Sequence, residues 1–279
     1  MIKRSLLVFA ALALGYSLFL HFTRVDWDTT QHLANGNRIK AERFAFDDAA
    51  DGGTVIIGSS LAYRLALDSF PQGTANLGFG GLSVYDGLEL IRRSGRKPKR
   101  VLVETNILFR EPDRAFLDAL FQPGLYQMRR QLPLMREENQ PSGVLFGWMK
   151  QRFLAQRSPE AAGDSSAGPS AVMLNEHRAR YAELPADSTQ ARFADMLASG
   201  AQALEQQGAE VIFFEMPIEA ELEASRLAEG ARALVKARFP THRVLRAGPD
   251  GWRTTDGLHL AKPDAARFSG WLAREAGPR

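Results

Sequence analysis

The stretch Thr54-Val55-Ile56-Ile57-Gly58-Ser59-Ser60 decides the fold. A short run of mostly β-branched residues between glycines is typical of a strand buried on both faces. The run ends in a Gly-Ser-Ser turn, and Leu61–Leu67 then reads as one or two helical turns. A buried strand that passes directly into a helix indicates an α/β protein, because parallel strands need long crossover connections.

The same alternation continues along the chain. Further strands are predicted at residues 75–77, 101–103, 211–214 and 244–245. Helices are predicted at 82–93, 191–207, from Pro217 to about Arg238, and at 262–275. Alternating strands and helices predict a three-layer α/β/α domain with a parallel sheet. With 279 residues, the chain is long enough for one large domain of this kind, about 54–279, with an insertion.

Residues 107–190 break the rhythm and form the predicted insertion. Helical segments are expected at 114–120, 125–134 and 144–154. Residues 158–170 are rich in Ser, Gly, Pro and Ala, which favours a flexible loop. The insertion is either a lid over a site or a docking surface, and the residues do not distinguish the two.

The N-terminus carries an apolar segment. Ser5–Phe22 holds 18 residues without a charge, which is the short end for a membrane span. Lys3 and Arg4 precede it and favour a cytoplasmic N-terminus. We expect residues 1–23 to be an uncleaved transmembrane anchor and 24–53 a polar stalk with a short helix. A cleaved signal peptide and a buried helix of a soluble protein are the alternatives.

Composition excludes several classes of function. The net charge of +3 is too small to indicate nucleic-acid binding, and the absence of cysteine excludes disulfides, thiolate chemistry and a lipoprotein anchor. The basic run Arg92–Arg100 links a helix to the start of a strand. It is therefore expected at the edge of the sheet opposite the usual ligand site, as a solvated loop or a contact for anionic lipid headgroups. We expect no metal and no cofactor.

A second motif, Asp256-Gly257-Leu258-His259, supplies a base and a carboxylate. In a tight loop, this spacing lets Asp256 accept the Nδ1–H of His259 and leaves Nε2 to face Ser60. A serine hydroxyl needs such a base to act as a nucleophile. The structural alternatives are an N-cap serine at position 59 or 60 and an Asx turn at Asp256.

Two further motifs lie between these, Asn76–Gly81 and Val103–Asn106. The order Ser, Gly, Asn and Asp-x-x-His resembles the SGNH hydrolase superfamily, which contains GDSL-type esterases and acyltransferases. The resemblance covers roughly residues 54–110 and 205–275 and implies a flavodoxin-like sheet.

By this resemblance, Ser60 is the nucleophile, His259 the base and Asp256 its orienting acid. The backbone N–H groups of Ser60 and Gly81 and the side-chain amide of Asn106 form the oxyanion hole, with Gly78 and Gly80 as adjacent candidates. Ser59 stands where the family usually has Asp, and Ile107 where a second Asp usually follows the Asn. Relatives that carry Gly-Ser-Ser include acyltransferases.

An anchored, outward-facing domain of this kind is similar to proteins that O-acylate cell-envelope polysaccharides, some with a multi-spanning membrane acyltransferase as partner. The expected function is serine-dependent O-acetyl transfer to, or removal from, a cell-envelope polysaccharide or exopolysaccharide. The expected location is the bacterial inner membrane, with the domain in the periplasm. A plain esterase or lipase is one alternative. A non-catalytic scaffold in a polysaccharide-secretion complex is the other.

Overall fold

The computed structural model describes residues 2–23, 25, 28–46, 51–154, 171–248 and 251–277. The chain forms two compact units. The helical unit comprises Met1–Phe46 and Asp118–Asp164, and the sheet unit comprises Asp47–Leu117 and Ser165–Arg279. The loop predicted at 158–170 lies outside the described residues.

The sheet unit contains five parallel strands in the order β2-β1-β3-β4-β5. Their bounds are Thr54–Gly58 for β1, Ala75–Gly78 for β2, Arg100–Glu104 for β3, Glu210–Glu215 for β4 and Arg243–Arg246 for β5. All five predicted strands are confirmed. The three central strands are buried because their residues are apolar at consecutive positions, so both faces of the sheet need a cover.

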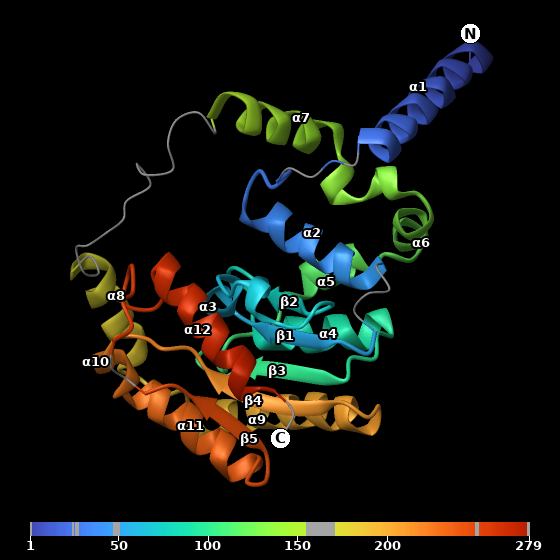
Figure 1. Cartoon of the computed structure of the whole chain (residues 1–279). Coiled ribbons are helices and arrows are strands. Elements are labelled where there is room, and N and C mark those ends of the chain that lie inside the picture. Colours follow the sequence, from blue (N-terminus) through green and yellow to red (C-terminus); the bar gives the residue numbers. More distant parts are fainter. Residues whose placement is uncertain are drawn as a thin grey trace. The chain divides into compact units, whose positions relative to one another are not determined.

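Helices cover both faces of this sheet (Figure 1). On one face, α3 (Ser60–Tyr63) and α12 (Lys262–Glu275) pack on a core that includes Ile56, Leu102 and Phe214. On the other face, α4 (Val84–Ser94) contacts β1 and α9 (Asp187–Gln206) contacts β4. The predicted α/β fold with a parallel sheet is therefore confirmed.

The predicted helix from Pro217 to Arg238 is wrong in its start and its continuity. The structure has a short α10 (Ala220–Glu223) followed by α11 (Arg226–Arg238). Ser225 separates them, since its side chain accepts a hydrogen bond from the N–H of Ala228 at 3.3 Å and so caps the start of α11. A serine that bonds to nearby backbone N–H groups favours a helix start over a helix interior.

The predicted insertion is divided between the two units. Its helical-unit part contains α6 (Pro123–Gln131), two short 3₁₀ turns η3 (Pro133–Met135) and η4 (Glu137–Asn139), α7 (Pro141–Met149) and η5 (Lys150–Leu154). Its sheet-unit part contains α8 (Ala171–Tyr181). α5 (Arg114–Leu120) lies where the chain passes from one unit to the other.

The N-terminal part of the helical unit holds two helices. α1 (Ile2–Thr23) is apolar, has no buried residue and is long enough to cross a membrane, properties that a membrane anchor and a signal sequence share. The short helix predicted within 24–53 is α2 (Leu33–Phe46). Its residues Ile39, Glu42 and Phe44 are buried, and α2 contacts η4 of the same unit.

Two arginines of the basic run Arg92–Arg100 form ion pairs with distant parts of the chain. Arg96 contacts Asp51 at 2.8 Å, and Arg100 contacts Glu210 at 2.7 Å. Because the run precedes β3, it lies at the amino edge of that strand, while Ser60 follows the carboxyl end of β1. The basic side chains therefore connect structural elements on the side away from Ser60.

α3 packs so closely on β2 that a side chain at Gly78 has no room. A Cβ at this position would lie 2.5 Å from the backbone N of Tyr63 and 2.6 Å from the backbone carbon of Ala62. We expect Gly78→Ala to lower the free energy of unfolding by about 1–3 kcal/mol, because backbone must move to relieve the overlap. Urea unfolding of the full chain in detergent, followed by circular dichroism, measures this.

Gly124→Ala is the control, since nothing lies within 4 Å of a Cβ at that position. Equal stability of the two variants would contradict the close packing of α3 on β2.

Candidate active site at the carboxyl edge of the sheet

The turn after β1 separates two adjacent serines. Ser59 is the N-cap of α3, and its Oγ accepts a hydrogen bond from the N–H of Leu61 at 3.2 Å. Ser59 is buried, whereas Ser60 is the first residue of α3 and partly exposed. The capping role that the sequence left open between the two serines therefore belongs to Ser59, and the hydroxyl of Ser60 is available for another contact.

Glu104, at the end of β3, holds this turn in place. Its Oε2 accepts hydrogen bonds from the backbone N–H of Ser59 at 2.6 Å and from the Ser59 hydroxyl at 2.7 Å. Burial raises the pKa of Glu104, against the hydrogen bonds from Ser59, which lower it. Gly58 makes room for the carboxylate, because a Cβ there would lie 2.7 Å from Oε2 of Glu104.

His259 meets the hydroxyl of Ser60. Its Nε2 lies 2.9 Å from Ser60 Oγ, although the two residues are 199 positions apart. Its Nδ1 lies 2.6 Å from Oδ2 of Asp256. A carboxylate at Nδ1 favours the tautomer with its hydrogen there and leaves Nε2 as the acceptor for a serine proton. The structure thus brings together the three residues predicted from the two motifs.

The carboxylate of Asp256 both forms an Asx turn and contacts the imidazole of His259. Its Oδ1 accepts the backbone N–H groups of Leu258 at 3.0 Å and His259 at 2.7 Å, which is an Asx turn, while its Oδ2 contacts the imidazole. Burial raises the pKa of Asp256, but the hydrogen bonds from the ring and backbone of His259 outweigh it and hold the pKa well below its ordinary value. The carboxylate is therefore charged at neutral pH.

The glycine-rich turn follows the neighbouring strand. β2 ends at Gly78, which pairs with Gly58 of β1. The turn is tied to β1 by a hydrogen bond from the N–H of Phe79 to the carbonyl of Gly58 at 3.1 Å. Gly81 is exposed and has a φ of +78°, a conformation that favours glycine. The N–H of Gly78 donates to Asn76 Oδ1 at 2.7 Å, which makes it a poorer oxyanion donor than Gly81.

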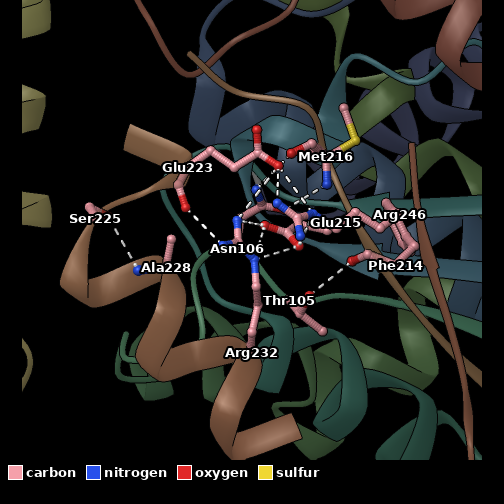
Figure 2. Close-up of polar contacts among 10 residues, drawn as sticks. All are labelled: Thr105, Asn106, Phe214, Glu215, Met216, Glu223, Ser225, Ala228, Arg232 and Arg246. Atoms are coloured by element: carbon pink, nitrogen blue, oxygen red, sulfur yellow. Dashed lines mark hydrogen bonds and ion pairs between the residues drawn. The ribbon is translucent and has the colours of Figure 1, made fainter. Parts of the chain in front are cut away.

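Asn106 is fixed by the strand on its other side. Its Oδ1 accepts the N–H of Met216 at 2.7 Å, and its Nδ2 donates to the carbonyl of Met216 at 2.8 Å (Figure 2). This pair of bonds sets the orientation of the amide. Nδ2 carries two hydrogens, and only one of them has a hydrogen-bond partner among the residues that the structure describes.

A partly buried ion-pair cluster supports Met216. The preceding residue, Glu215, ends β4 and accepts hydrogen bonds from the guanidinium of Arg232 at 2.6–3.0 Å (Figure 2). Arg246 of β5 lies 3.3 Å from the same carboxylate. Glu223 of α10 lies beside both arginines. The cluster ties the end of β4 to α10, α11 and β5, and thereby positions the backbone that holds Asn106.

α8 contributes residues that the sequence did not point to. Nε2 of His177 lies 4.0 Å from Oδ2 of Asp256, and neither ring nitrogen has a hydrogen-bond partner in the part of the chain that the structure describes. Burial lowers the pKa of His177, against the nearby Asp256 charge, which raises it. Leu174 packs on the same loop, because a Cβ on Gly257 would lie 2.7 Å from its Cδ1.

The arrangement combines a serine hydroxyl, an imidazole and a charged carboxylate in one hydrogen-bonded chain. Backbone and amide N–H groups follow the adjacent strand ends. These parts can remove a proton from a nucleophile and carry it to a leaving group.

Comparison with known proteins adds no family to this description. No protein-family model matches the chain, and no curated protein matches it.

The low pKa of Asp256 has a measurable consequence for stability. An unfolded aspartate titrates near pH 3.9, and the native carboxyl titrates below that. The stabilisation by ionised Asp256 is therefore fully present above the unfolded pKa and is lost as the pH falls through the native pKa. We expect Asp256→Asn to lower the free energy of unfolding by about 1.5–3 kcal/mol at pH 7, and by progressively less below pH ~4.

Urea unfolding of both proteins between pH 7 and pH 3 measures the difference. A difference that stays constant over this range would contradict the proposed charge state of Asp256.

Proposed function

We propose that the protein is an extracytoplasmic, serine-dependent acyl-ester enzyme. The observation that carries the proposal is the hydrogen-bonded chain from Ser60 Oγ through His259 to Asp256, at 2.9 Å and 2.6 Å. The neighbouring serine, Ser59, is buried, and its hydroxyl donates to Glu104 instead. Of the two serines, Ser60, whose hydroxyl contacts the imidazole base, is thus the more exposed.

The first half of the proposed reaction forms an acyl-enzyme. Ser60 Oγ attacks the carbonyl carbon of an acyl ester while Nε2 of His259 takes the hydroxyl proton. The charge of Asp256 stabilises the resulting imidazolium. The ester bond then breaks, and the leaving alcohol receives the proton from His259.

The second half transfers the acyl group to an acceptor. An acceptor hydroxyl gives its proton to His259 and attacks the acyl carbon, and Ser60 leaves with that proton returned to its oxygen. Each half passes through an oxyanion, for which the proposed donors are the N–H groups of Ser60 and Gly81 and the remaining Nδ2 hydrogen of Asn106.

The resemblance of the motifs to the SGNH superfamily supports an acyl-transfer role at the cell envelope. The proposed substrate is a polysaccharide that gains or loses O-acetyl groups. In this proposal α1 anchors the protein in the bacterial inner membrane, and the sheet unit lies in the periplasm. A multi-spanning acyltransferase of the same membrane would supply the acyl group. The apolar, unburied surface of α1 is consistent with such an anchor.

Replacement of the nucleophile tests the chemistry. With p-nitrophenyl acetate as the acyl donor, we expect Ser60→Ala and His259→Ala each to lower kcat/KM by at least about 10³-fold, since neither variant can form the acyl-enzyme efficiently. Ser59→Ala is the matched control. It removes the helix cap and the hydroxyl's hydrogen bond to buried Glu104, at a cost of about 2–4 kcal/mol in stability. It keeps the bond from the backbone N–H of residue 59 to Glu104, so we expect Ser60 still to face His259.

Equal activity of wild type and the folded Ser60→Ala variant would rule out Ser60 as the nucleophile. Absence of turnover in every folded protein, wild type included, would favour a non-catalytic scaffold.

Asn106 and Thr105 form a second matched pair. Both side chains follow β3 and bond to the backbone at the end of β4. Asn106 bonds to the N–H and carbonyl of Met216, and the hydroxyl of Thr105 donates to the carbonyl of Phe214 at 3.1 Å. We expect Asn106→Ala to lower kcat about 10²–10³-fold through the loss of an oxyanion donor. Thr105→Val should cost about 1 kcal/mol of stability with kcat unchanged.

Kinetics and unfolding of both variants give the two readouts. If kcat fell equally in the two, Asn106 would act only through the packing of β3 on β4.

A further inference from the structure

The helix α7 exposes its large apolar side chains and buries its small residues. Gly143, Val144 and Gly147 are buried, and a Cβ on Gly143 would lie 3.1 Å from the carbonyl of Thr29. The opposite face presents Leu145, Phe146, Trp148 and Met149, which are 57%, 42%, 45% and 48% exposed. A surface helix in water has the reverse arrangement, with its large apolar residues towards the core.

The apolar face continues past the end of the helix and then becomes charged. Phe153 is 60% exposed and stacks edge-on against Trp148, with ring centroids 6.0 Å apart. Lys150 and Arg152 are exposed between them. Residues 123–154 hold five Lys or Arg and two Glu, so the segment carries excess positive charge. Large apolar residues bordered by basic ones are typical of helices that lie in a membrane interface.

The contacts of α1 place this segment near one end of that helix. The hydroxyl of Tyr16 donates to the carbonyl of Asn139, two residues before α7 begins. Tyr16 precedes the end of α1 at Thr23 by seven residues, or about 10 Å of helix. Interfacial helices bury their apolar faces roughly 5–10 Å into the boundary between headgroups and acyl chains. In a membrane crossed by α1, the segment before α7 would reach this boundary.

The first residues of α7 also remain close to the chain that leaves α1. Gly143 packs against Thr29, and Nζ of Lys150 lies 3.2 Å from Oδ2 of Asp28. Thus Gly143, near the start of α7, and Lys150, which directly follows its end, both lie against residues 28–29, a few positions beyond the end of α1 and within the same unit.

We propose that the exposed face of α7 inserts into the outer leaflet of the membrane that α1 crosses. The helical unit then contacts the bilayer through both α1 and α7. The occupant of this face is the lipid boundary itself, with acyl chains around Leu145, Phe146 and Met149, and anionic headgroups near Arg152. The inference rests on the proposed anchoring by α1, and it is independent of the chemistry at Ser60.

Site-specific fluorescence in a bilayer tests the inference. The chain has no cysteine, so single-cysteine variants of the full protein carry one environment-sensitive nitrobenzoxadiazole label each. The test positions are Phe146→Cys and Met149→Cys. Leu12→Cys, on α1, is the positive control, and Val244→Cys, an apolar residue of β5 that is 49% exposed, is the reference for a surface position outside the helical unit.

Each variant is placed in nanodiscs of phosphatidylethanolamine and phosphatidylglycerol, with and without lipids that carry a spin label near the headgroup end of the acyl chain. For the label at 12, which lies about 17 Å from the end of α1, the spin label is placed near the methyl end of the acyl chain instead. We expect blue-shifted emission at 146 and 149 and quenching of roughly twofold or more by the labelled lipid, with little quenching at 244.

Labels at 146 and 149 that are quenched no more than the label at 244 would overturn the proposal. So would blue-shifted labels that lipid does not quench, because a second protein or another copy of this chain would then cover α7. Quenching at 12 without quenching at 146 would reject the interfacial helix alone. Absence of quenching at 12 as well as at 146 would also reject the anchoring by α1.

Discussion

The carboxylate of Glu104 is the contact on which the site depends. β1 and β3 are neighbours in a parallel sheet, so their carboxyl ends meet at one edge. Glu104 uses that closeness to bind both the N–H and the hydroxyl of Ser59. Because these bonds are buried, water cannot replace them, and the turn between β1 and α3 has one strongly preferred conformation. That conformation turns Ser59 inward and leaves Ser60 facing His259.

The other site residues are fixed by similar contacts to strand ends. Asn106 is held through Met216, whose neighbour Glu215 is held by Arg232 and Arg246. Asp256 folds its own loop through two backbone bonds before it meets the imidazole. The side chains of Ser59, Asn106 and Asp256 are thus positioned by bonds that do not involve a substrate. Such preorganisation is what charge stabilisation during acyl transfer requires.

The sequence carried enough information for the sheet and for the pairing of Ser60, His259 and Asp256. Buried parallel strands are short apolar runs with sharp borders, and the Asp-x-x-His spacing is local, so both leave a signal in consecutive residues. The pairing of His259 with Ser60, 199 positions away, was expected only from the resemblance of the motif order to the SGNH superfamily. Glu104 left a weaker signal, a carboxylate at the end of an apolar strand, and no sequence motif linked it to Ser59, 45 residues earlier in the chain.

Other features depend on packing that no local pattern reports. His177 reaches Asp256 from a helix within the insertion, 79 residues away in the chain. The pattern of α7 predicts a helix, but only the structure shows that its glycines face inward and its aromatic residues outward. The division of residues 107–190 between two units is likewise set by contacts of η4 with α2 and of α8 with α10 and α11.

The most direct test of Ser60 as an activated nucleophile is covalent labelling with a fluorophosphonate, followed by intact-mass and peptide mass spectrometry of the full-length protein. The hydrogen-bonded chain through His259 and Asp256 predicts a single phosphonyl adduct on Ser60, formed much more slowly in His259→Ala. An adduct on Ser59 or on another residue, or no adduct on the folded protein, would contradict it.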